Sequence, residues 1–404
     1  MTFQAERINT PISTQELERR WAAVRAAMHA SHIDALIMQN NNDHMGGYVK
    51  WFIDLPAVNG YPVTVVFPAD DDMTVIAQGP IGVIQELSTE GDGLRRGVKY
   101  VRNTSIFVSV GYSLAQDTEQ AEKALEKWSR GTIGLVGTGT LPISLIDPLR
   151  RKYNGAQFVD ATKLVDQIKV PKSAEELELC RRAAAVQDDA MKTTFAAIKP
   201  GMRDQDVAGV AIEAVFNGGG EQGIYLCSSN PSDAEPGTVV PISSTHTLNR
   251  ALRKGDVFHI LIETNGPGGM YTELGRTCVL GKAPQELKDE FALMLQARQY
   301  TLSLLKPGAS CKDIWDAHNA FMRSKKLPEE LRLYCHGQGY DLVEPPLVRF
   351  DETMPIAESM NIACHPTWIS SHFFNSITDN YFIGPNGVSE HVHKFAEIIT
   401  EIDC

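Results

Sequence analysis

Two glutamates and a histidine lie in sequence contexts that suit acid–base chemistry. Glu263 and Glu273 are ten residues apart and flank the stretch Gly-Pro-Gly-Gly at 266–269. That stretch is typical of a hairpin tip, because a glycine-rich phosphate loop would join a strand to a helix. His336 lies in the sequence His-Gly-Gln-Gly, whose glycines permit another backbone to approach closely. Paired carboxylates favour a cationic or N–H-rich ligand by charge complementarity, so the pattern indicates a polar catalytic pocket.

The elements that position these residues belong to the second part of the chain. The sequence Ser-Ala-Glu-Glu at 173–176 is a capping box, and it predicts a long helix over about 173–198. A proline-containing linker, QIKVPK, comes just before that helix. We therefore predict two domains, over residues 1–167 and 168–404.

An internal repeat is visible within the second domain. The stretches around Pro200 and Pro307 share one plan, in which a helix ends at Lys-Pro-Gly and an amphipathic helix follows. The two prolines are 107 residues apart, and so are Asp206 and Asp313. Two copies of a helix–turn–helix unit predict a domain with pseudo-two-fold symmetry.

The first domain shows the alternation of an α/β fold. A capping-box pattern at 13–16 leads into a helix with Leu17, Trp21, Val24 and Met28 on one face. A further helix is expected over 113–128. Apolar runs bounded by turn residues predict strands at 33–38, 64–67, 73–77, 99–102 and 132–137.

Composition excludes several classes of function. The chain has 404 residues and a net charge of −12, with no cluster of Lys and Arg to bind a phosphate backbone. No apolar run approaches the roughly 18 residues of a membrane span, and the polar N-terminus has no signal core. The seven cysteines are scattered without a C-x-x-C pair. We expect a reduced, cytoplasmic protein that binds neither nucleic acid nor membrane.

Five motifs taken in order resemble those of a known superfamily. They are KVPKSAEELELCRRAA, GDVFHILIETNGPGGMYTELGRTCVLG, HGQGYDLVEPP, MNIACHP and ITDNYFIGPNG. Together they resemble the creatinase/prolidase/methionine aminopeptidase superfamily over essentially the whole chain. In character they are nearest to its metal-independent creatinase and ectoine hydrolase-like members. The resemblance implies an α+β protein, with an N-terminal α/β creatinase-type domain followed by a duplicated pita-bread domain. It also implies a homodimer in which the partner's N-terminal domain lies near the site.

Metal-dependent members of that superfamily hold two metal ions with two Asp, one His and two Glu. Here Glu263 and Glu273 replace the aspartates, His336 matches the histidine, and His365 and Thr378 replace the glutamates. Because two negative charges are lost, we do not expect two ions, and no cofactor is the main expectation. The alternative is one Fe, Mn or Zn ion bound by Glu263, Glu273, His336 and His365.

The metal-independent relatives imply a mechanism based on side chains alone. His246, nine residues before Gly255, is the expected general acid or base, with an ordinary pKa of about 6.5. Glu263 or Glu273 would stabilise the developing charge or act as nucleophile, and His336 would take part in catalysis and, with His365, orient the substrate. Further candidates for substrate contact are Thr378, Tyr48 and Trp51, for which ordinary packing is the alternative.

We therefore expect a hydrolase that cleaves a C–N bond in a small polar substrate, such as an amidine, a cyclic amide or an amino-acid-like ring. A mononuclear metalloenzyme, either Xaa-Pro dipeptidase-like or a lyase, is the first alternative. A pseudoenzyme that uses the pocket only for binding is the second. Glu273 also has a purely structural interpretation, because it lies three residues before Arg276 and would form an ion pair with it.

Overall fold

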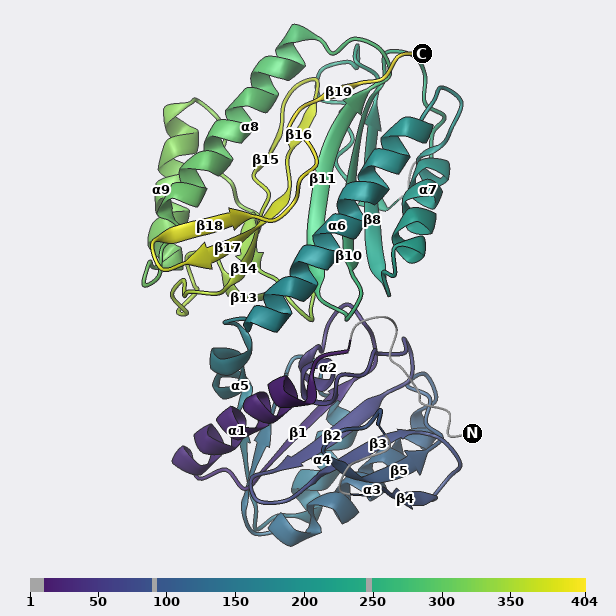
Figure 1. The fold of residues 1–404 in the computed structure, drawn as a ribbon, viewed down its shortest axis with the longest axis vertical. Coiled ribbons are helices and arrows are strands. Elements are labelled where there is room, and N and C mark those ends of the chain that lie inside the picture. The colour runs from purple at the N-terminus through teal and green to yellow at the C-terminus, as the bar shows by residue number, and fades with distance from the viewer. Residues whose placement is uncertain (1–10, 89–92, 245–248) are drawn as a thin grey trace. The chain divides into compact units, whose positions relative to one another are not determined.

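The computed structural model describes residues 11–88, 93–244 and 249–404. The chain divides into two compact units, Met1–Val170 and Pro171–Cys404, which are described separately (Figure 1). The predicted boundary lay between residues 167 and 168. Much of the predicted linker is helical instead, because helix α5 (Thr162–Lys169) extends to the residue before Val170. Pro171 follows at once and has no N–H with which to continue the helix.

The first unit contains a seven-stranded sheet in the order β4-β5-β3-β2-β1-β6-β7. Five of its strands are parallel to one another, while β2 and β4 are antiparallel to their neighbours. The strands are β1 (Ala35–Asn40), β2 (Val63–Pro68), β3 (Met73–Gln78), β4 (Ile84–Glu86), β5 (Val98–Thr104), β6 (Thr132–Leu135) and β7 (Gln157–Asp160).

Helices accompany this sheet as the sequence predicts. In α1 (Thr14–Ala30) the Ser13 hydroxyl accepts a hydrogen bond from the Glu16 N–H at 3.1 Å, and the predicted apolar face is buried. The expected helix 113–128 consists of a 3₁₀ turn η1 (Gly111–Leu114), α3 (Ala115–Leu125) and a second turn η2 (Glu126–Trp128). Residues of α3 and α4 (Ile143–Lys152) share one apolar core with β1 and β6. The short helix α2 (Tyr48–Ile53) follows β1 in the chain.

The second unit has two five-stranded sheets, each with a pair of helices. One sheet has the order β19-β11-β10-β8-β9, and the other β13-β12-β14-β17-β18, beside a two-stranded sheet β15-β16. The elements are α6 (Ala174–Ala197), α7 (Asp204–Asn217), β8 (Gly223–Asn230), β9 (Ser243–Ser244), β10 (Val257–Asn265), β11 (Tyr271–Val279), α8 (Gln285–Leu304), α9 (Cys311–Ser324), β12 (Cys335–Gly337), β13 (Glu344–Leu347), β14 (Asn361–Cys364), β15 (Thr367–Ile369), β16 (Phe374–Ser376), β17 (Asp379–Gly384), β18 (Gly387–His391) and β19 (Thr400–Glu401).

The repeat seen in the sequence is a repeat in the structure. The two Lys-Pro-Gly turns separate α6 from α7 and α8 from α9, and Gly201 and Gly308 adopt φ values of 92° and 86°. Such values favour glycine, which explains why each turn carries one. Asp206 accepts a hydrogen bond from the Arg203 N–H at the start of α7, and Ser310 caps α9 at the Asp313 N–H. The predicted α+β fold with a duplicated second domain is confirmed.

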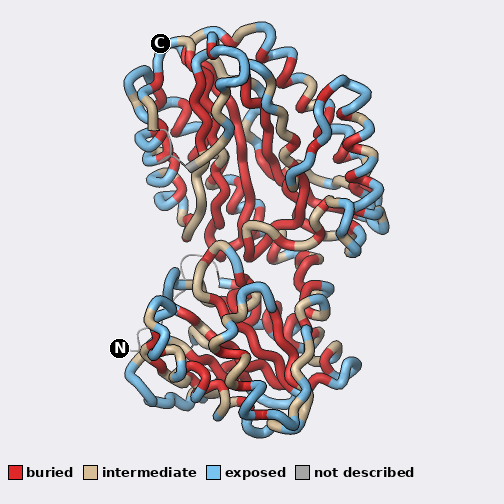
Figure 2. The backbone as a smooth tube through the Cα atoms, turned by 180° about the vertical axis from the view of Figure 1, so that it is seen from behind, coloured by how far each residue is buried: buried red, intermediate tan, exposed pale blue. Residues whose placement is uncertain are grey.

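The two sheets of the second unit meet where β11 passes the start of β17. Gly275 and Thr378 exchange backbone hydrogen bonds of 3.1 and 3.3 Å. A Cβ atom on Gly275 would lie 2.7 Å from the Thr378 hydroxyl oxygen, so only glycine permits this approach. Figure 2 shows the strands of this region as buried, and every residue of β11 and β17 is buried. Among the described residues, none of the helices is long and apolar enough to span a membrane.

Candidate active site

The β10–β11 hairpin sets Glu263 and Glu273 opposite each other. The two residues are direct partners in the register of the antiparallel pair, so their side chains leave the same face of the sheet. Gly268 and Gly269 in the tip adopt φ values of 93° and 85°, which explains the glycine-rich sequence of the turn. Both carboxyl groups are buried.

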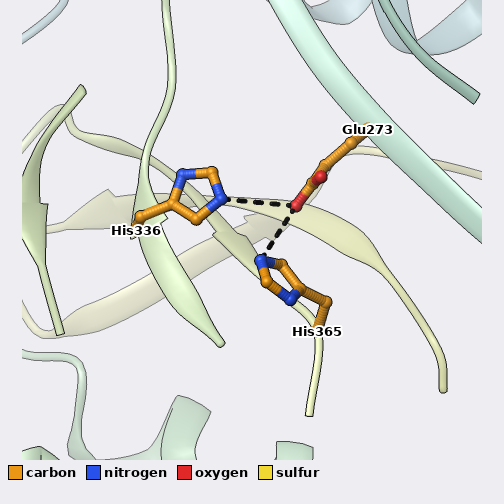
Figure 3. A group of neighbouring side chains, drawn as sticks. All are labelled: Glu273, His336 and His365. Atoms are coloured by element: carbon orange, nitrogen blue, oxygen red, sulfur yellow. Dashed lines mark ion pairs between the residues drawn. The ribbon is translucent and has the colours of Figure 1, made fainter. Parts of the chain in front are cut away.

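The second sheet brings two histidines to the same place. His336 belongs to β12, and His365 follows the last residue of its neighbour β14. The Glu273 Oε1 atom lies 3.7 Å from His336 Nε2 and 3.5 Å from His365 Nε2 (Figure 3). His336 is buried and His365 is partly exposed. One half of the domain therefore supplies the carboxylates, and the other half the imidazoles.

Two of the atoms that face one another in this group, His336 Nε2 and Glu273 Oε1, need a hydrogen-bond or cation partner. The Nδ1 atom of His336 is 2.8 Å from the carbonyl oxygen of Gly337 and donates to it, so Nε2 carries the lone pair. Glu273 Oε1 is buried and has no hydrogen-bond partner within the described ranges. A proton, a metal cation or a substrate N–H group would satisfy both atoms.

Burial shifts the pKa values of the acids and of the bases in opposite directions. It raises the pKa of Glu263 to about 8, against a hydrogen bond that lowers it. Burial, with the charge of Glu263 second, raises the pKa of Glu273 well above its usual range. Burial lowers the pKa of His336 to about 4, and burial followed by the charge of His336 lowers that of His365. The chain alone therefore holds its protons on the carboxyl groups and keeps both imidazoles neutral at pH 7.

Three carboxamides hold the glutamates in place, and sequence reasoning missed all of them. Gln338 Nε2 donates to Glu263 Oε1 at 3.0 Å, and Asn380 Nδ2 donates to Gln338 Oε1 at 2.9 Å. The N–H of Glu273 donates to Asn380 Oδ1 at 2.8 Å, and Asn380 Nδ2 also reaches Asn361 Oδ1 at 3.0 Å. The only sequence signal was position, because Gln338 lies between the two glycines of the His-Gly-Gln-Gly motif.

Arg276 does not pair with Glu273, so the predicted structural ion pair between them is wrong. Its guanidinium binds Asp379 at 2.6 Å and also donates to the carbonyl oxygen of Thr378. The reason is strand geometry, because neighbours three apart on a strand point to opposite faces. Thr378 itself is buried and forms the bridge to Gly275. Its contact with substrate stays a prediction.

Three further candidates from the sequence, His246, Tyr48 and Trp51, are not part of this group among the described residues. His246 falls outside the described residues. Tyr48 lies in the first unit, where its hydroxyl donates to Asp166 at 2.8 Å. Trp51 is fully buried there, with the Arg20 guanidinium 5.2 Å from its ring centre. A role for either aromatic residue at a partner's site stays a prediction.

The donor atoms fit one metal ion and do not fit two. Glu273, His336 and His365 each offer a ligand atom, and these atoms lie within 4.8 Å of one another. Glu263 does not join that group, which corrects the expected set of four. Two ions would need bridging carboxylates, and the group has a single one. A carboxylate oxygen without a partner and two neutral imidazoles do suit one ion, so the donor set does not support the expectation that no cofactor is needed.

Comparison with known proteins defines the class to which this fold and site belong. The model of metallopeptidase family M24 matches residues 178–389, and the chain belongs to that family, which groups it with hydrolases. The predicted place in the creatinase/prolidase superfamily is thereby confirmed.

Individual relatives have low sequence identity to this chain, but the similarity covers most of its length. An Xaa-Pro dipeptidase of Pyrococcus furiosus is 22% identical over 274 residues, which are 66% of this chain and 75% of the relative. An uncharacterized hydrolase/peptidase of Sinorhizobium fredii, y4tL, is 26% identical over 323 residues, 76% of each chain. The crystal structure of dipeptidase PepE from Mycobacterium ulcerans has a TM-score of 0.75 at 19% identity, covering 98% of this chain and 100% of that one. This likeness confirms the predicted pita-bread fold.

Proposed function

We propose that this protein hydrolyses an amide-type C–N bond in a small, polar, N–H-rich substrate, either with side chains alone or with one bound metal ion. The observation that carries the proposal is the cross-strand pair of buried carboxyl groups, Glu263 and Glu273, beside two neutral imidazoles. Membership of a hydrolase family supports the reaction class.

In the mechanism that uses side chains alone, each group has a defined task. Neutral His336 and His365 accept hydrogen bonds at Nε2 from the attacking water and from substrate N–H groups. Glu263 is protonated at neutral pH and donates its proton to the leaving nitrogen. The water oxygen bonds to the carbon atom, the C–N bond breaks, and the proton lost by water returns to the carboxyl group. His246 remains the predicted shuttle for that proton.

A single-ion hydrolase is the second candidate, and the geometry of Glu273 favours it. Its unpartnered Oε1 atom faces the Nε2 atoms of both histidines, so Glu273, His336 and His365 would hold the ion. A bound ion would polarise the scissile carbonyl and lower the pKa of a water molecule. Since one relative is named an Xaa-Pro dipeptidase, dipeptides are the substrates to test for this candidate.

Metal content and chelator sensitivity separate the two candidates. The protein is purified without chelator, its metal is measured per chain, and hydrolysis is followed on dipeptides, including Xaa-Pro, and on cyclic amides and amidines. Near-zero metal with turnover that survives chelator supports side-chain catalysis. About one Fe, Mn or Zn per chain, with activity lost on chelation and restored by the metal, supports the second candidate. Binding of such compounds without turnover under either condition contradicts both and favours a pseudoenzyme.

A further inference from the structure

A cavity in the first unit has the features of a second ligand site. Its volume is about 120 Å³, and its polar lining residues are Gln39, Asn41, Asp117 and Ser144. Apolar side chains, among them Ile106 and Leu145, form the rest of the wall. No residue of the candidate active site takes part. The cavity thus combines an apolar wall with a few polar groups, as small-molecule sites do.

The cavity lies where α/β sheets commonly bind ligands. Gln39 and Asn41 lie at the carboxyl end of β1, Ile106 follows β5, and Ser144 lies in the first turn of α4, after β6. These three strands are parallel, so their carboxyl ends share one edge of the sheet. In open α/β sheets, ligands bind in crevices beyond that edge.

Asp117 is the residue that sets the chemistry of the cavity. The whole residue is 3% exposed, and its carboxylate accepts hydrogen bonds from Thr104 Oγ1 at 2.8 Å and from Gln39 Nε2 at 3.0 Å. Both donors are neutral. No Lys, Arg or His within the described ranges forms an ion pair or hydrogen bond with this carboxyl group. Burial accordingly raises the pKa of Asp117 to about 6.

Other buried carboxylates of the same unit form ion pairs with cationic side chains. Glu16 pairs with Arg20 at 2.9 Å, Asp43 with Lys50 at 3.0 Å, and Asp54 with Arg96 at 2.6 Å. A buried carboxylate is normally paired with a cation, because the unpaired charge is costly to remove from water. Asp117 instead lines a cavity with room for a cation to enter.

We infer that this cavity binds a small organic cation, with a primary ammonium or amidinium group on Asp117 and an apolar body against Ile106 and Leu145. An engineered cavity of about 150 Å³ binds benzene, which has six non-hydrogen atoms, so a volume of about 120 Å³ suits a ligand of roughly five. The inference is independent of the proposed hydrolysis, because the site lies wholly within the first unit.

Calorimetric titration of the 404-residue chain with isobutylamine at pH 8 tests the inference. We expect saturable binding of one molecule at the cavity, at least tenfold weaker in Asp117→Asn and at least tenfold weaker for isobutanol, its neutral analogue. The matched control is Asp147→Asn, which alters a carboxylate of α4 that does not line the cavity. The double variant Glu263→Gln/Glu273→Gln tests whether the ligand binds at the candidate active site instead. We expect the affinity of this variant to equal that of the parent protein.

The variant Ser144→Leu gives a second, independent measurement. It fills the cavity while Asp117 stays intact, and it should also weaken binding at least tenfold, even if Asp117→Asn fails to fold. Equal affinity in Asp117→Asn and the parent protein would overturn the inference. So would equal affinity for isobutanol, loss of binding in the double glutamate variant, or no saturation below roughly 10 mM, an affinity worth less than about 3 kcal/mol.

Discussion

The protons of the candidate site reside on groups that are ionised in water, and its imidazoles are kept neutral. Glu263 and Glu273 hold protons because both are buried side by side, while His336 is held neutral by the same burial. An environment that raises the pKa of acids and lowers the pKa of bases creates a proton donor and a proton acceptor in one site at the same pH, as general acid–base catalysis requires. The reactivity of each residue thus depends on its neighbours more than on its type.

Removing one carboxyl group tests this arrangement. Glu263→Gln keeps the shape and the contact with Gln338 but has no acidic proton, so we expect turnover to fall by roughly 10²–10⁴-fold. The thermal midpoint should stay the same or rise, because the variant also removes a buried acid. Glu290→Gln is the matched control, since that glutamate is buried on α8 against Asn375, away from the site. Full activity in Glu263→Gln would rule out its role as proton donor.

The same residue predicts the pH profile. The raised pKa of Glu263 means that its protonated form persists up to about pH 8. If that form is the active one, kcat/KM should be level below this pH and decline above it. The profile is measured with a substrate that does not itself ionise between pH 6 and 10. An activity that rises through pH 8 would assign Glu263 the opposite role, as a base.

At the scale of elements, the site depends on how closely two sheets approach each other. Glu273 on β11 and Asn380 on β17 are joined by a hydrogen bond from backbone to side chain, two residues away from the bridge between Gly275 and Thr378. The distance between the carboxylates and the histidines is therefore set by β11 and its neighbours across the junction. Small residues at that junction are structural requirements of the site.

Gly275→Ala tests this dependence. The added Cβ would lie 2.7 Å from the Thr378 hydroxyl oxygen and 2.9 Å from its Cβ, so the sheets must separate. We expect a loss of about 1–3 kcal/mol in the free energy of unfolding, as for other overpacked sites, together with a lower kcat. Adding Thr378→Gly in the same chain removes both atoms and should recover part of each loss. Failure of the second substitution to recover anything would show that the junction is not the cause.

Sequence patterns predicted the elements well where burial follows a regular period. The α1 face, five of the seven strands of the first sheet and the two Lys-Pro-Gly turns were found, because period and capping are local properties. The short strands β4 and β7 were not predicted. The strand predicted at 33–38 was placed two residues too early, since β1 covers Ala35–Asn40. Gln39 and Asn40 are polar but buried, and Gln39 is satisfied by Thr64 and Asp117, two long-range partners that no local pattern reveals.

The candidate site was predicted only in part for the same reason. Glu273, His336 and His365 were chosen correctly as neighbours, while Gln338, Asn361 and Asn380 were overlooked. Amide side chains carry no distinctive spacing, and their importance comes from contacts across 19 to 107 positions of the chain. The separation of Glu263 from the group formed by Glu273, His336 and His365 likewise depends on side-chain geometry that register alone does not give.

At the scale of the whole molecule, each unit is stabilised by a core of its own. One core joins the seven-stranded sheet to α3 and α4, and another joins α6 and α7 to β8, β10 and β11. Changes in one unit can therefore be followed separately from the chemistry of the other. The homodimer, its shared site and the cytoplasmic location remain predictions.

The stability of the first unit should depend on pH through Asp117. Because its pKa is raised to about 6 in the folded chain, the folded state binds a proton more tightly than the unfolded one does. That contribution is complete below about pH 4 and is lost as the pH rises through 6, a change of roughly 3 kcal/mol. Calorimetry of the parent and of Asp117→Asn from pH 4 to 7 measures the difference, in which the other groups cancel. Parallel curves for the two proteins would contradict the raised pKa.

The division of the site between the two halves of the duplicated domain has a practical consequence. Glu263 and Glu273 precede the connection between β11 and α8, whereas His336 and His365 follow it. A chain divided at that connection would yield two fragments, each with half of the reacting groups and neither competent alone. Because β19 at the far end pairs with β11 of the first fragment, the fragments retain a means of recognising each other. Recovered turnover would then report their reassociation, so the domain is suited to use as a split enzyme.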